Sequence, residues 1–252
     1  MPSSPAGSFS MLPKQPGYRV EGLGSARFGP RAAACFSQPM ERFRDRKDAG
    51  ARVAEELVGI VDIGPSPVVL GIPRGGIVVA DVVARELDAE LDVIAVEKVG
   101  APWNRELAVG AVGEGETMWL DAKLAKQVEA AVLARTIKAE RAELAKKLAD
   151  VRRIWPRIDL AGRTVIVVDD GVATGSTVRA ALLALQRAAP ARRILAVPVG
   201  SPQTLAELEG VADVVVCPLR PSYFQAVGLW YDVFGQVSQA EVLEILERRR
   251  DA

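Results

Sequence analysis

The pattern of hydrophobic positions along the chain changes its period several times. Short runs of branched apolar residues, typical of buried strands, alternate with segments whose apolar residues recur every three or four positions, as in amphipathic helices. The expected strands cover residues 68–72, 91–96, 107–112, 117–120, 165–168, 193–199 and 212–218. The expected helices cover residues 41–57, 77–87, 121–153, 177–188, 202–209 and a last segment with Ser238 as its N-cap. This alternation predicts an α/β fold with a mostly parallel sheet flanked by helices.

Two of the expected helices carry informative patterns. In the first, five apolar residues fall on one face: Phe43, Ala49, Val53, Ala54 and Leu57. The segment 121–153 places Ala, Leu and Ile at helical spacing among many Lys, Arg and Glu residues. An amphipathic helix that covers the sheet and a nucleic-acid-binding arm both fit this segment. Because acidic residues interleave with the basic ones, the covering helix is favoured.

Residues 1–40 differ in composition from the rest of the chain. They are rich in Pro, Gly and Ser and have no sustained apolar period, so we expect a poorly ordered tail before a single domain at 41–252. Because Met40 directly precedes the first organised segment, an early start codon is an alternative explanation. The stretch lacks the basic and apolar regions of a secretory signal peptide, and none is expected.

Composition narrows the chemistry that the chain can perform. Lys and Arg together number 32, as do Asp and Glu, so the net charge of +0 does not favour nucleic-acid binding through bulk charge. The chain has no histidine, which excludes Ser-His triads, histidine zinc sites and imidazole acid–base catalysis. Cys35 and Cys217 form no CxxC pair, and the apolar surroundings of Cys217 predict a buried thiol. No apolar run is long enough to span a membrane. We therefore expect a cytoplasmic protein with neither a membrane nor a nucleic acid as its partner.

The strongest functional signal is the stretch Val165-Ile-Val-Val-Asp-Asp-Gly-Val-Ala-Thr-Gly-Ser-Thr177. Four branched apolar residues predict a buried parallel strand, and Asp169 and Asp170 follow at its carboxyl end, where open α/β sheets bind ligands. The small residues of 171–177 let backbone N–H groups approach an anion, and the helix that starts near Ser176 directs its positive end to the same point. Carboxylates for hydroxyls or a metal, beside an anion site, suit a sugar phosphate.

This stretch closely resembles the phosphoribosyl-pyrophosphate (PRPP) motif of the type I phosphoribosyltransferases. The alternative is a generic strand–loop–helix with the paired Asp residues as a helix cap, but the apolar strand, the acids and the Thr-Gly loop coincide in register. A P-loop is excluded because no Gly-Lys-Ser/Thr follows at the required spacing. The resemblance implies that Asp169 and Asp170 bind the ribose hydroxyls and act in catalysis, while the loop binds the 5′-phosphate. The implied PRPP-binding set is Asp169, Asp170, Gly171, Val172, Ala173, Thr174, Gly175, Ser176 and Thr177.

Two basic positions fit the same family. Gly71-Ile-Pro-Arg-Gly-Gly76 follows the first core strand, and the resemblance assigns Arg74, Gly75 and Gly76 to pyrophosphate. A tight turn that needs a glycine is the alternative interpretation. Lys98, at the end of the second strand, is a further pyrophosphate ligand by analogy with the family, or else a surface lysine.

The family also carries a mobile loop that closes over the site, at the place where this chain has Gly100-Ala-Pro-Trp-Asn-Arg-Glu106. Arg105 or Glu106 could reach a substrate from such a loop, and closure would exclude water from the reaction. Trp103 could anchor this lid or simply be an exposed hydrophobic residue.

The base-binding hood of this family lies outside the core sheet, and the hood candidate here is residues 219–237. Its aromatic residues are Tyr223, Phe224, Trp230 and Tyr231. Stacking on a planar base, for which Tyr223 and Phe224 are the assigned candidates, is one interpretation. Sealing of the sheet edge is equally compatible with the pattern.

The match departs from the family at one position. Ala173 stands where hypoxanthine–guanine enzymes usually carry an Asp, and Ala-Thr-Gly looks more like the adenine or uracil enzymes. Val99-Gly-Ala-Pro102 and Ala226-Val-Gly228 look most like a bacterial group of predicted phosphoribosyltransferases with no assigned base. The resemblance covers residues 41–247, and no general base is assigned.

The resemblance implies a type I phosphoribosyltransferase-like fold with a small hood region. It implies transfer of 5-phosphoribosyl from PRPP to a nitrogen nucleophile, expected to be a nucleobase, with release of pyrophosphate. Mg²⁺ would accompany PRPP, held largely by the substrate's own oxygens with no direct protein ligand. The alternative is a PRPP-binding regulatory module without transferase activity, which the intact Arg74 loop and the lack of a helix-turn-helix pattern in 1–40 disfavour. A PRPP synthetase-like reaction would need an ATP-binding feature, and none is visible. The acceptor base and a homo-oligomeric state stay open.

Overall fold

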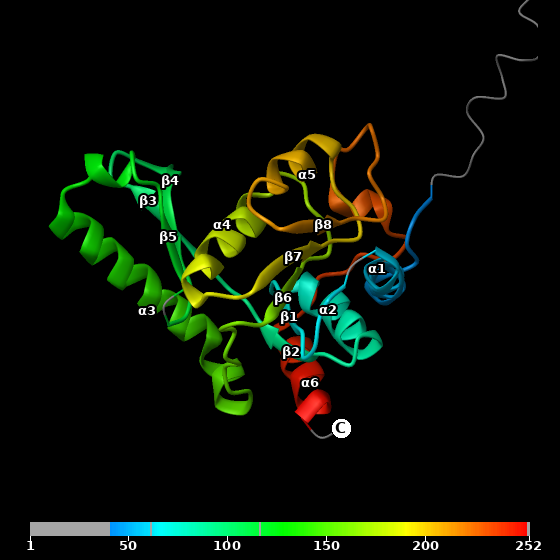
Figure 1. The fold of residues 1–252 in the computed structure, drawn as a ribbon. Helices are drawn as coiled ribbons and strands as arrows, with labels where there is room; N and C mark the ends of the chain where they lie inside the picture. The colour runs from blue at the N-terminus through cyan, green and yellow to red at the C-terminus, as the bar shows by residue number, and fades with distance from the viewer. Residues whose placement is uncertain (1–40, 61, 116, 251–252) are drawn as a thin grey trace, which may run out of the picture. The chain divides into compact units, whose positions relative to one another are not determined.

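The computed structural model describes residues 41–60, 62–115 and 117–250. The expected tail at 1–40, with Cys35, lies outside these residues. Within the described part, five strands form a central sheet and three strands form a second, smaller one (Figure 1).

The central sheet has the strand order β2-β1-β6-β7-β8, and every neighbouring pair is parallel. Its strands are β1 (Val68–Gly71), β2 (Glu90–Val93), β6 (Thr164–Val168), β7 (Arg192–Ala196) and β8 (Val214–Val216). The chain adds β2 on one side of β1 and then β6, β7 and β8 on the other. The order of addition therefore reverses between β1 and β6. In open α/β sheets, ligands bind at the carboxyl ends of the strands that flank such a switch point.

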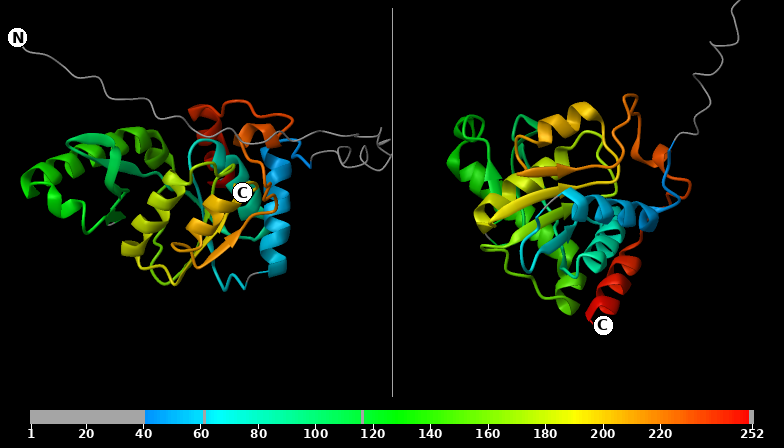
Figure 2. Two further views of the ribbon diagram at one scale, coloured as in Figure 1. Left: turned by 90° about the horizontal axis from the view of Figure 1, so that it is seen from above. Right: turned by 45° about the vertical axis from the view of Figure 1, so that its right-hand side comes forward.

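Helices cover both faces of the central sheet (Figure 2). They are α1 (Arg46–Ile60), α2 (Gly75–Glu86), α3 (Ala130–Ile154), α4 (Ser176–Leu185), α5 (Pro202–Leu208) and α6 (Gln239–Arg250). The expected N-cap of the last helix is confirmed, because the Glu241 backbone N–H donates to Ser238 Oγ at 3.2 Å. None of the helices in the described part is both long and apolar enough to cross a membrane.

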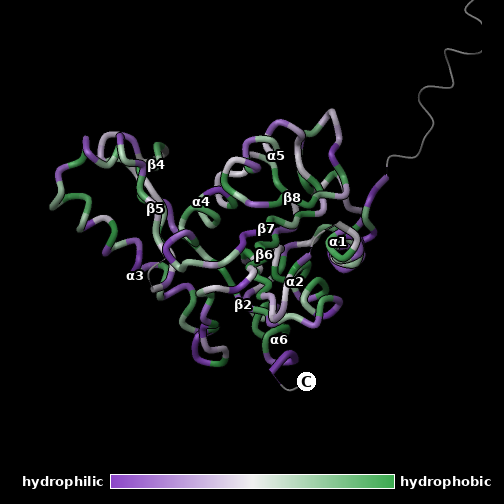
Figure 3. Tube along the Cα trace, in the orientation of Figure 1, coloured by the Kyte–Doolittle hydropathy of each residue, from purple (hydrophilic) through white to green (hydrophobic). Residues whose placement is uncertain are grey.

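Successive side chains of the central strands enter two different apolar layers. In β6, Ile166 and Val168 join the layer under α1, α2, α3 and α6, whereas Val165 and Val167 join the layer under α4 and α5. All four side chains are fully buried. Burial on both faces explains why this strand is continuously apolar, and the apolar residues gather along the strands of this sheet (Figure 3). The expected α/β architecture is thus confirmed.

The second sheet is antiparallel, with the order β3-β4-β5. Its strands are β3 (Glu97–Ala101), β4 (Asn104–Val112) and β5 (Met118–Leu120). The strands expected near 107–112 and 117–120 are therefore present, but they pair with 97–101 rather than with the parallel sheet. Val99 and Val109 of this sheet pack with the first half of α3, and Leu144 and Leu148 of its second half reach the central core. The expected covering helix is confirmed, although it begins at Ala130 and not at 121.

The first helix also begins later than the pattern predicted. Residues 41–45 lie outside the helix because Phe43 pairs with the end of the chain: the Phe43 N–H donates to the Trp230 carbonyl, and the Asp232 N–H donates to the Phe43 carbonyl, both at 2.9 Å. Phe43 is buried as expected, yet it packs on the Tyr231 ring from outside α1, with ring centroids 5.3 Å apart. Long-range pairing has overridden the local helical pattern here.

Cys217 is a buried thiol, as the sequence predicted. It lies just after β8 and is 2% exposed, and its Sγ donates to the Leu219 carbonyl at 3.2 Å. Burial raises the pKa of this thiol to about 12, so it stays protonated and unreactive at neutral pH.

Candidate active site

Asp169 and Asp170 stand at the carboxyl end of β6, next to the switch point between β1 and β6. Oδ1 of Asp169 accepts a hydrogen bond from the Asp170 backbone N–H at 2.9 Å. Burial and the neighbouring Asp170 charge raise the pKa of the Asp169 carboxyl to about 8. Burial also raises the pKa of Asp170, but Arg46 opposes this rise through a hydrogen bond and its positive charge. Asp169 is therefore largely protonated near neutral pH in the free protein, while Arg46 favours the ionised form of Asp170.

The loop after β1 packs directly on these two carboxyls. A Cβ on Gly76 would lie 2.8 Å from Asp169 Cα and 2.8 Å from the Val168 carbonyl oxygen, and a Cβ on Gly75 would overlap Oδ2 of Asp170. Both positions therefore require glycine for close approach and not for a turn with positive φ. Arg74 precedes them and is exposed. The structure thus brings the predicted pyrophosphate residues and the predicted ribose residues together at one edge of the sheet.

The loop between β6 and α4 is anchored by its backbone. The Val172 N–H donates to the Val199 carbonyl at 2.8 Å, and the Ala173 carbonyl accepts from Thr204 Oγ1 at 2.8 Å. Gly175 has a φ of 68°, in the left-handed region, and its missing side chain leaves room for Thr204. These contacts hold the loop in place and do not use the hydroxyl and backbone N–H groups at the start of α4, which could bind an anion.

The first turn of α4 offers an exposed set of donors. Thr174, Ser176 and Thr177 are exposed around the N-terminus of this helix, where free backbone N–H groups and the helix dipole attract a phosphate. Lys98, the second residue of β3, donates from Nζ to Ser176 Oγ at 2.9 Å. The structure therefore places Lys98 beside the predicted 5′-phosphate loop, and it reaches this point from the second sheet and not from the end of β2.

A cavity of about 550 Å³ adjoins the exposed Arg74. It lies over the ends of β1 and β2, between these strands and the helices α3 and α6. Its polar lining consists of Arg74, Glu97, Lys147, Thr177 and Gln239. Lys147 Nζ and Glu97 Oε1 form an ion pair at 2.6 Å on its rim. A larger hollow of about 610 Å³ lies beside Asp88 and Arg249, at the amino end of the sheet and away from the paired carboxyls.

The segment expected to be a lid forms the turn of the β3–β4 hairpin. Residues 102 and 103 connect the two strands, and Trp103 is 54% exposed at this turn. Arg105 and Glu106 lie in the first half of β4. A two-stranded arm with an exposed tip is compatible with a lid, and closure of this arm stays a prediction.

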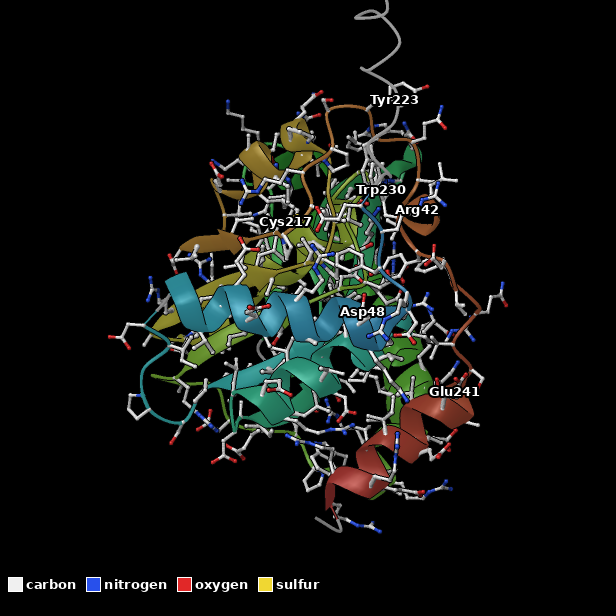
Figure 4. The ribbon with its side chains drawn as sticks, turned by 90° about the vertical axis from the view of Figure 1, so that its right-hand side faces the viewer. Arg42, Asp48, Cys217, Tyr223, Trp230 and Glu241 are labelled. Atoms are coloured by element: carbon white, nitrogen blue, oxygen red, sulfur yellow. The ribbon has the colours of Figure 1, made fainter. Side chains whose placement is uncertain are left out.

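The hood candidate contains one short helix, η4 (Val227–Trp230), and is otherwise irregular. Trp230 and Tyr231 are 9% and 4% exposed and belong to an apolar cluster with Phe43 and Leu219, so these two rings seal the end of the sheet. Phe224 packs partly against the same cluster. Tyr223 is 74% exposed at the outer end of the segment (Figure 4). Of the four aromatic side chains, Tyr223 therefore has the most free surface for a ligand.

Two residues contact Asp170 without any signal in the sequence that places them there. Arg46, at the start of α1, donates from Nε to Asp170 Oδ2 at 2.8 Å. The Tyr231 hydroxyl donates to the Asp170 backbone carbonyl at 2.6 Å. Arg46 lies in a charged run that is typical of a solvated helix face, and only the packing of α1 brings it to β6. The sequence pattern marks Tyr231 as an aromatic ring of the hood candidate and gives no sign of its hydrogen bond.

The oxygen donors of the site can be compared with the needs of a metal ion. Within the described residues, no group of three or more acidic, Cys or His side chains could hold a metal by itself. Two carboxylates are hard oxygen ligands and suit hydroxyl groups, or a Mg²⁺ ion that takes most of its ligands from a phosphorylated substrate. The residues present therefore fit Mg²⁺ that arrives with its substrate.

The fold and the site define a parallel α/β protein with paired carboxyls and an exposed helix start at its switch point. A sequence model of the family described as "Phosphoribosyl transferase domain" matches residues 41–232. This match spans more than half of the chain, and the chain belongs to that family. The family that the motif indicated is thereby confirmed.

Relatives and a solved structure agree with this assignment. Two curated proteins named "Putative phosphoribosyl transferase", from Mycobacterium tuberculosis strains CDC 1551 and H37Rv, are 40% identical over 211 residues, which make up 83% of this chain and 47% of each relative. The chain thus spans about half the length of the curated relatives it matches. The crystal structure of the protein TT1426 from Thermus thermophilus is 45% identical and has a TM-score of 0.76, over 82% of this chain and 98% of that chain.

Proposed function

We propose that this protein transfers the 5-phosphoribosyl group of PRPP to a ring nitrogen of a nucleobase and releases pyrophosphate. The observation that supports this most is the convergence of two segments. Gly75 and Gly76 pack on Asp170 and Asp169 so closely that a Cβ would overlap an Asp170 oxygen. The anion site at the start of α4 follows the same two carboxyls in the chain. A sugar with a phosphate at one end and a diphosphate at the other needs such an arrangement.

In this proposal each end of PRPP has its own ligands. The hydroxyls of Thr174, Ser176 and Thr177 and the backbone N–H groups of the loop bind the 5′-phosphate. Asp169 and Asp170 accept hydrogen bonds from the ribose hydroxyls and fix the ring. Arg74 and the backbone around Gly75 and Gly76 bind the diphosphate, for which the planar donor fork of Arg is well suited. Lys98 adds positive charge between the two phosphate groups.

The reaction exchanges one bond at C1 of the ribose for another. The bond from C1 to the pyrophosphate oxygen breaks, and its electron pair leaves with pyrophosphate. A lone pair of the acceptor nitrogen forms the new bond to C1, and the proton of that nitrogen is lost to solvent. The negative charge of Asp169 and Asp170 stabilises positive charge that develops at C1. Arg74 and Lys98 stabilise the negative charge of the leaving group.

Mg²⁺ would enter with PRPP, and its oxygen ligands would come largely from the substrate, next to Asp169 and Asp170. When bound, it would neutralise part of the charge on the departing pyrophosphate. The chain's own part is to orient the ribose ring and to keep donors around both phosphate ends.

The test is pyrophosphate release from PRPP and Mg²⁺ with a panel of purine and pyrimidine bases. We expect release with at least one base, and loss of both release and PRPP binding in Asp170→Asn. Asp150→Asn is the matched control, since Asp150 pairs with Arg153 on an exposed face of α3. PRPP binding without release for any base would support the regulatory module instead. Unchanged binding and turnover in Asp170→Asn would contradict the proposal.

A further inference from the structure

Arg46 connects three parts of the molecule that are far apart in the sequence. It is the first residue of α1, and its side chain is 11% exposed. Its Nε donates to Asp170 Oδ2 at 2.8 Å, and Nη1 donates to the Gly235 carbonyl at 2.8 Å. The guanidinium carbon lies 3.9 Å from the centroid of the Phe234 ring. One side chain thus joins α1, the β6 carboxyl and the end of the hood candidate.

Asp170 is held by this part of the hood at two points. Arg46 binds one oxygen of its side chain, and the Tyr231 hydroxyl binds its backbone carbonyl at 2.6 Å. The Tyr231 and Phe234 rings are themselves in contact, with centroids 4.9 Å apart. A Cβ on Gly75 would lie 3.0 Å from Arg46 Nε, so the pyrophosphate loop packs against the same ion pair. Any shift of the segment 231–235 would therefore move Asp170.

A contribution to stability alone explains this arrangement poorly. Buried ion pairs contribute little net stability compared with apolar side chains of similar size, because two charges lose their hydration. A guanidinium that is withdrawn from water is nevertheless an effective partner for fixing the position and charge of one carboxylate. The charged or titratable groups facing Asp170 are Asp169 directly after β6, Arg46 on α1 and Tyr231 from the hood candidate. Arg46 is the cation among these three.

We infer that Arg46 is a positioning residue that holds Asp170 ionised and oriented for the ribose. Arg46 also couples this carboxylate to the segment 231–235 at the end of the hood candidate. The inference rests on the proposed function, because it assumes that Asp170 binds the ribose of PRPP. Arg46 keeps one Asp170 oxygen for itself and leaves the other for a ribose hydroxyl. A well-ordered segment 231–235 then favours PRPP binding, and bound PRPP favours order in this segment.

The test compares Arg46→Gln with Arg46→Lys, and with Arg44→Gln as the matched control. Arg44 lies two residues earlier, and its side chain is 82% exposed beside Asp48. The measurement is the dissociation constant of Mg²⁺–PRPP by calorimetry between pH 6.5 and 9, with folding checked by circular dichroism. We expect Arg46→Gln to weaken binding by about tenfold to thirtyfold, as for loss of a hydrogen bond between charged groups. Its binding should also require a higher pH, because Asp170 has lost the cation that favours ionisation.

Arg46→Lys should restore the pH profile but not the full affinity, since it keeps the charge and loses the contacts with Gly235 and Phe234. If Arg46→Gln does not fold, Phe234→Leu is measured in its place. We expect this variant to bind PRPP about threefold more weakly, because it lacks the cation–π contact with Arg46. Wild-type affinity and an unchanged pH profile in Arg46→Gln would overturn the role of Arg46 and leave the proposed function standing. Wild-type affinity in Phe234→Leu would have the same meaning. No PRPP binding by the wild-type chain would overturn the proposed function and this inference with it.

Discussion

The segment 165–177 carries the paired carboxyls and the hood candidate 219–237 contacts Asp170 through Tyr231, yet the two segments are built in different ways. The first is a fully buried central strand followed by a loop that backbone hydrogen bonds hold in place. The second is mostly irregular, and Tyr223 and Val233 are 74% and 66% exposed. Its position depends on a distant segment, through backbone hydrogen bonds with Phe43 and contacts of the Arg46 side chain.

This difference separates the proposed donor side of the site from the proposed acceptor side. The groups expected to bind PRPP are held by the sheet and by the start of α4, so they are in place before any ligand arrives. The hood candidate has few backbone hydrogen bonds of its own, and regions of that kind open at low free-energy cost. We therefore expect substitutions in the first region to affect PRPP affinity strongly, and substitutions in the second to affect it weakly except through Arg46.

Gly75→Ala should have the largest effect on the donor side. The added Cβ would displace the Asp170 carboxylate, which can move without a backbone shift, so we expect PRPP affinity to fall about hundredfold while the chain stays folded. Calorimetry with PRPP and Mg²⁺, beside a thermal melt, measures both quantities. Gly59→Ala is the matched control, because the space around Gly59 in α1 is open. Equal affinity in the two variants would contradict the close packing of Gly75 on Asp170.

The charge state of Asp169 predicts a pH dependence of PRPP binding. Because the pKa of this carboxyl is about 8 in the free protein, binding to its ionised form must release a proton at lower pH. Affinity should therefore rise by up to about tenfold per pH unit from pH 7 to 8 and level off above that. Titrations in buffers of different ionisation enthalpy would detect the released proton. A flat profile over this range would show that Asp169 is already ionised.

Lys98→Met should weaken PRPP binding by about fivefold to tenfold, as expected for one charge-assisted contact with a phosphate. Its side chain already reaches Ser176 at the start of α4. Lys146→Met is a suitable control, because Lys146 pairs with Glu143 on an exposed face of α3. The two dissociation constants should differ clearly, and equal values would identify Lys98 as a surface residue.

Asp169→Asn should make the protein more stable at alkaline pH although it damages the site. The folded-state pKa of Asp169 lies above its unfolded value of 3.8, so the free energy of unfolding falls as the pH rises from about 4 to about 8 and stays at its lower value above that. The variant should exceed the wild type by about 1 kcal/mol in the free energy of unfolding at pH 8.5, and the gap should close toward pH 5. Urea unfolding at both pH values measures this gap. A variant that is less stable at pH 8.5 would contradict the raised pKa.

Tyr231→Phe should have the smallest effect. It removes the hydroxyl that holds the Asp170 carbonyl but keeps the ring in its apolar cluster, so we expect a loss of about threefold in PRPP affinity. Tyr223→Phe provides the comparison, since the exposed Tyr223 has no contact with the carboxyl pair and should leave PRPP affinity unchanged. A larger effect at Tyr223 than at Tyr231 would reverse the assignment of the two sides.

The sequence predicted the local structure of the segment 165–177 well because its signals are local. An apolar strand, two acids, a loop of small residues and a helix start follow one another within 165–177, and the glycines of 75–76 adjoin another buried strand. The late start of α1 and the position of Lys98 in a separate sheet depend on pairing between distant segments. The contact between Arg46 and Asp170 cannot be predicted from the sequence for the same reason, because the two residues are 124 positions apart.

Calorimetric titration with PRPP and Mg²⁺ tests whether Asp169 and Asp170 form a PRPP site. The wild-type chain and the double variant Asp169→Asn/Asp170→Asn should be titrated under identical conditions. We expect saturable binding of one PRPP per chain to the wild type and none to the double variant. Equal binding by both, or binding by neither, would contradict this expectation.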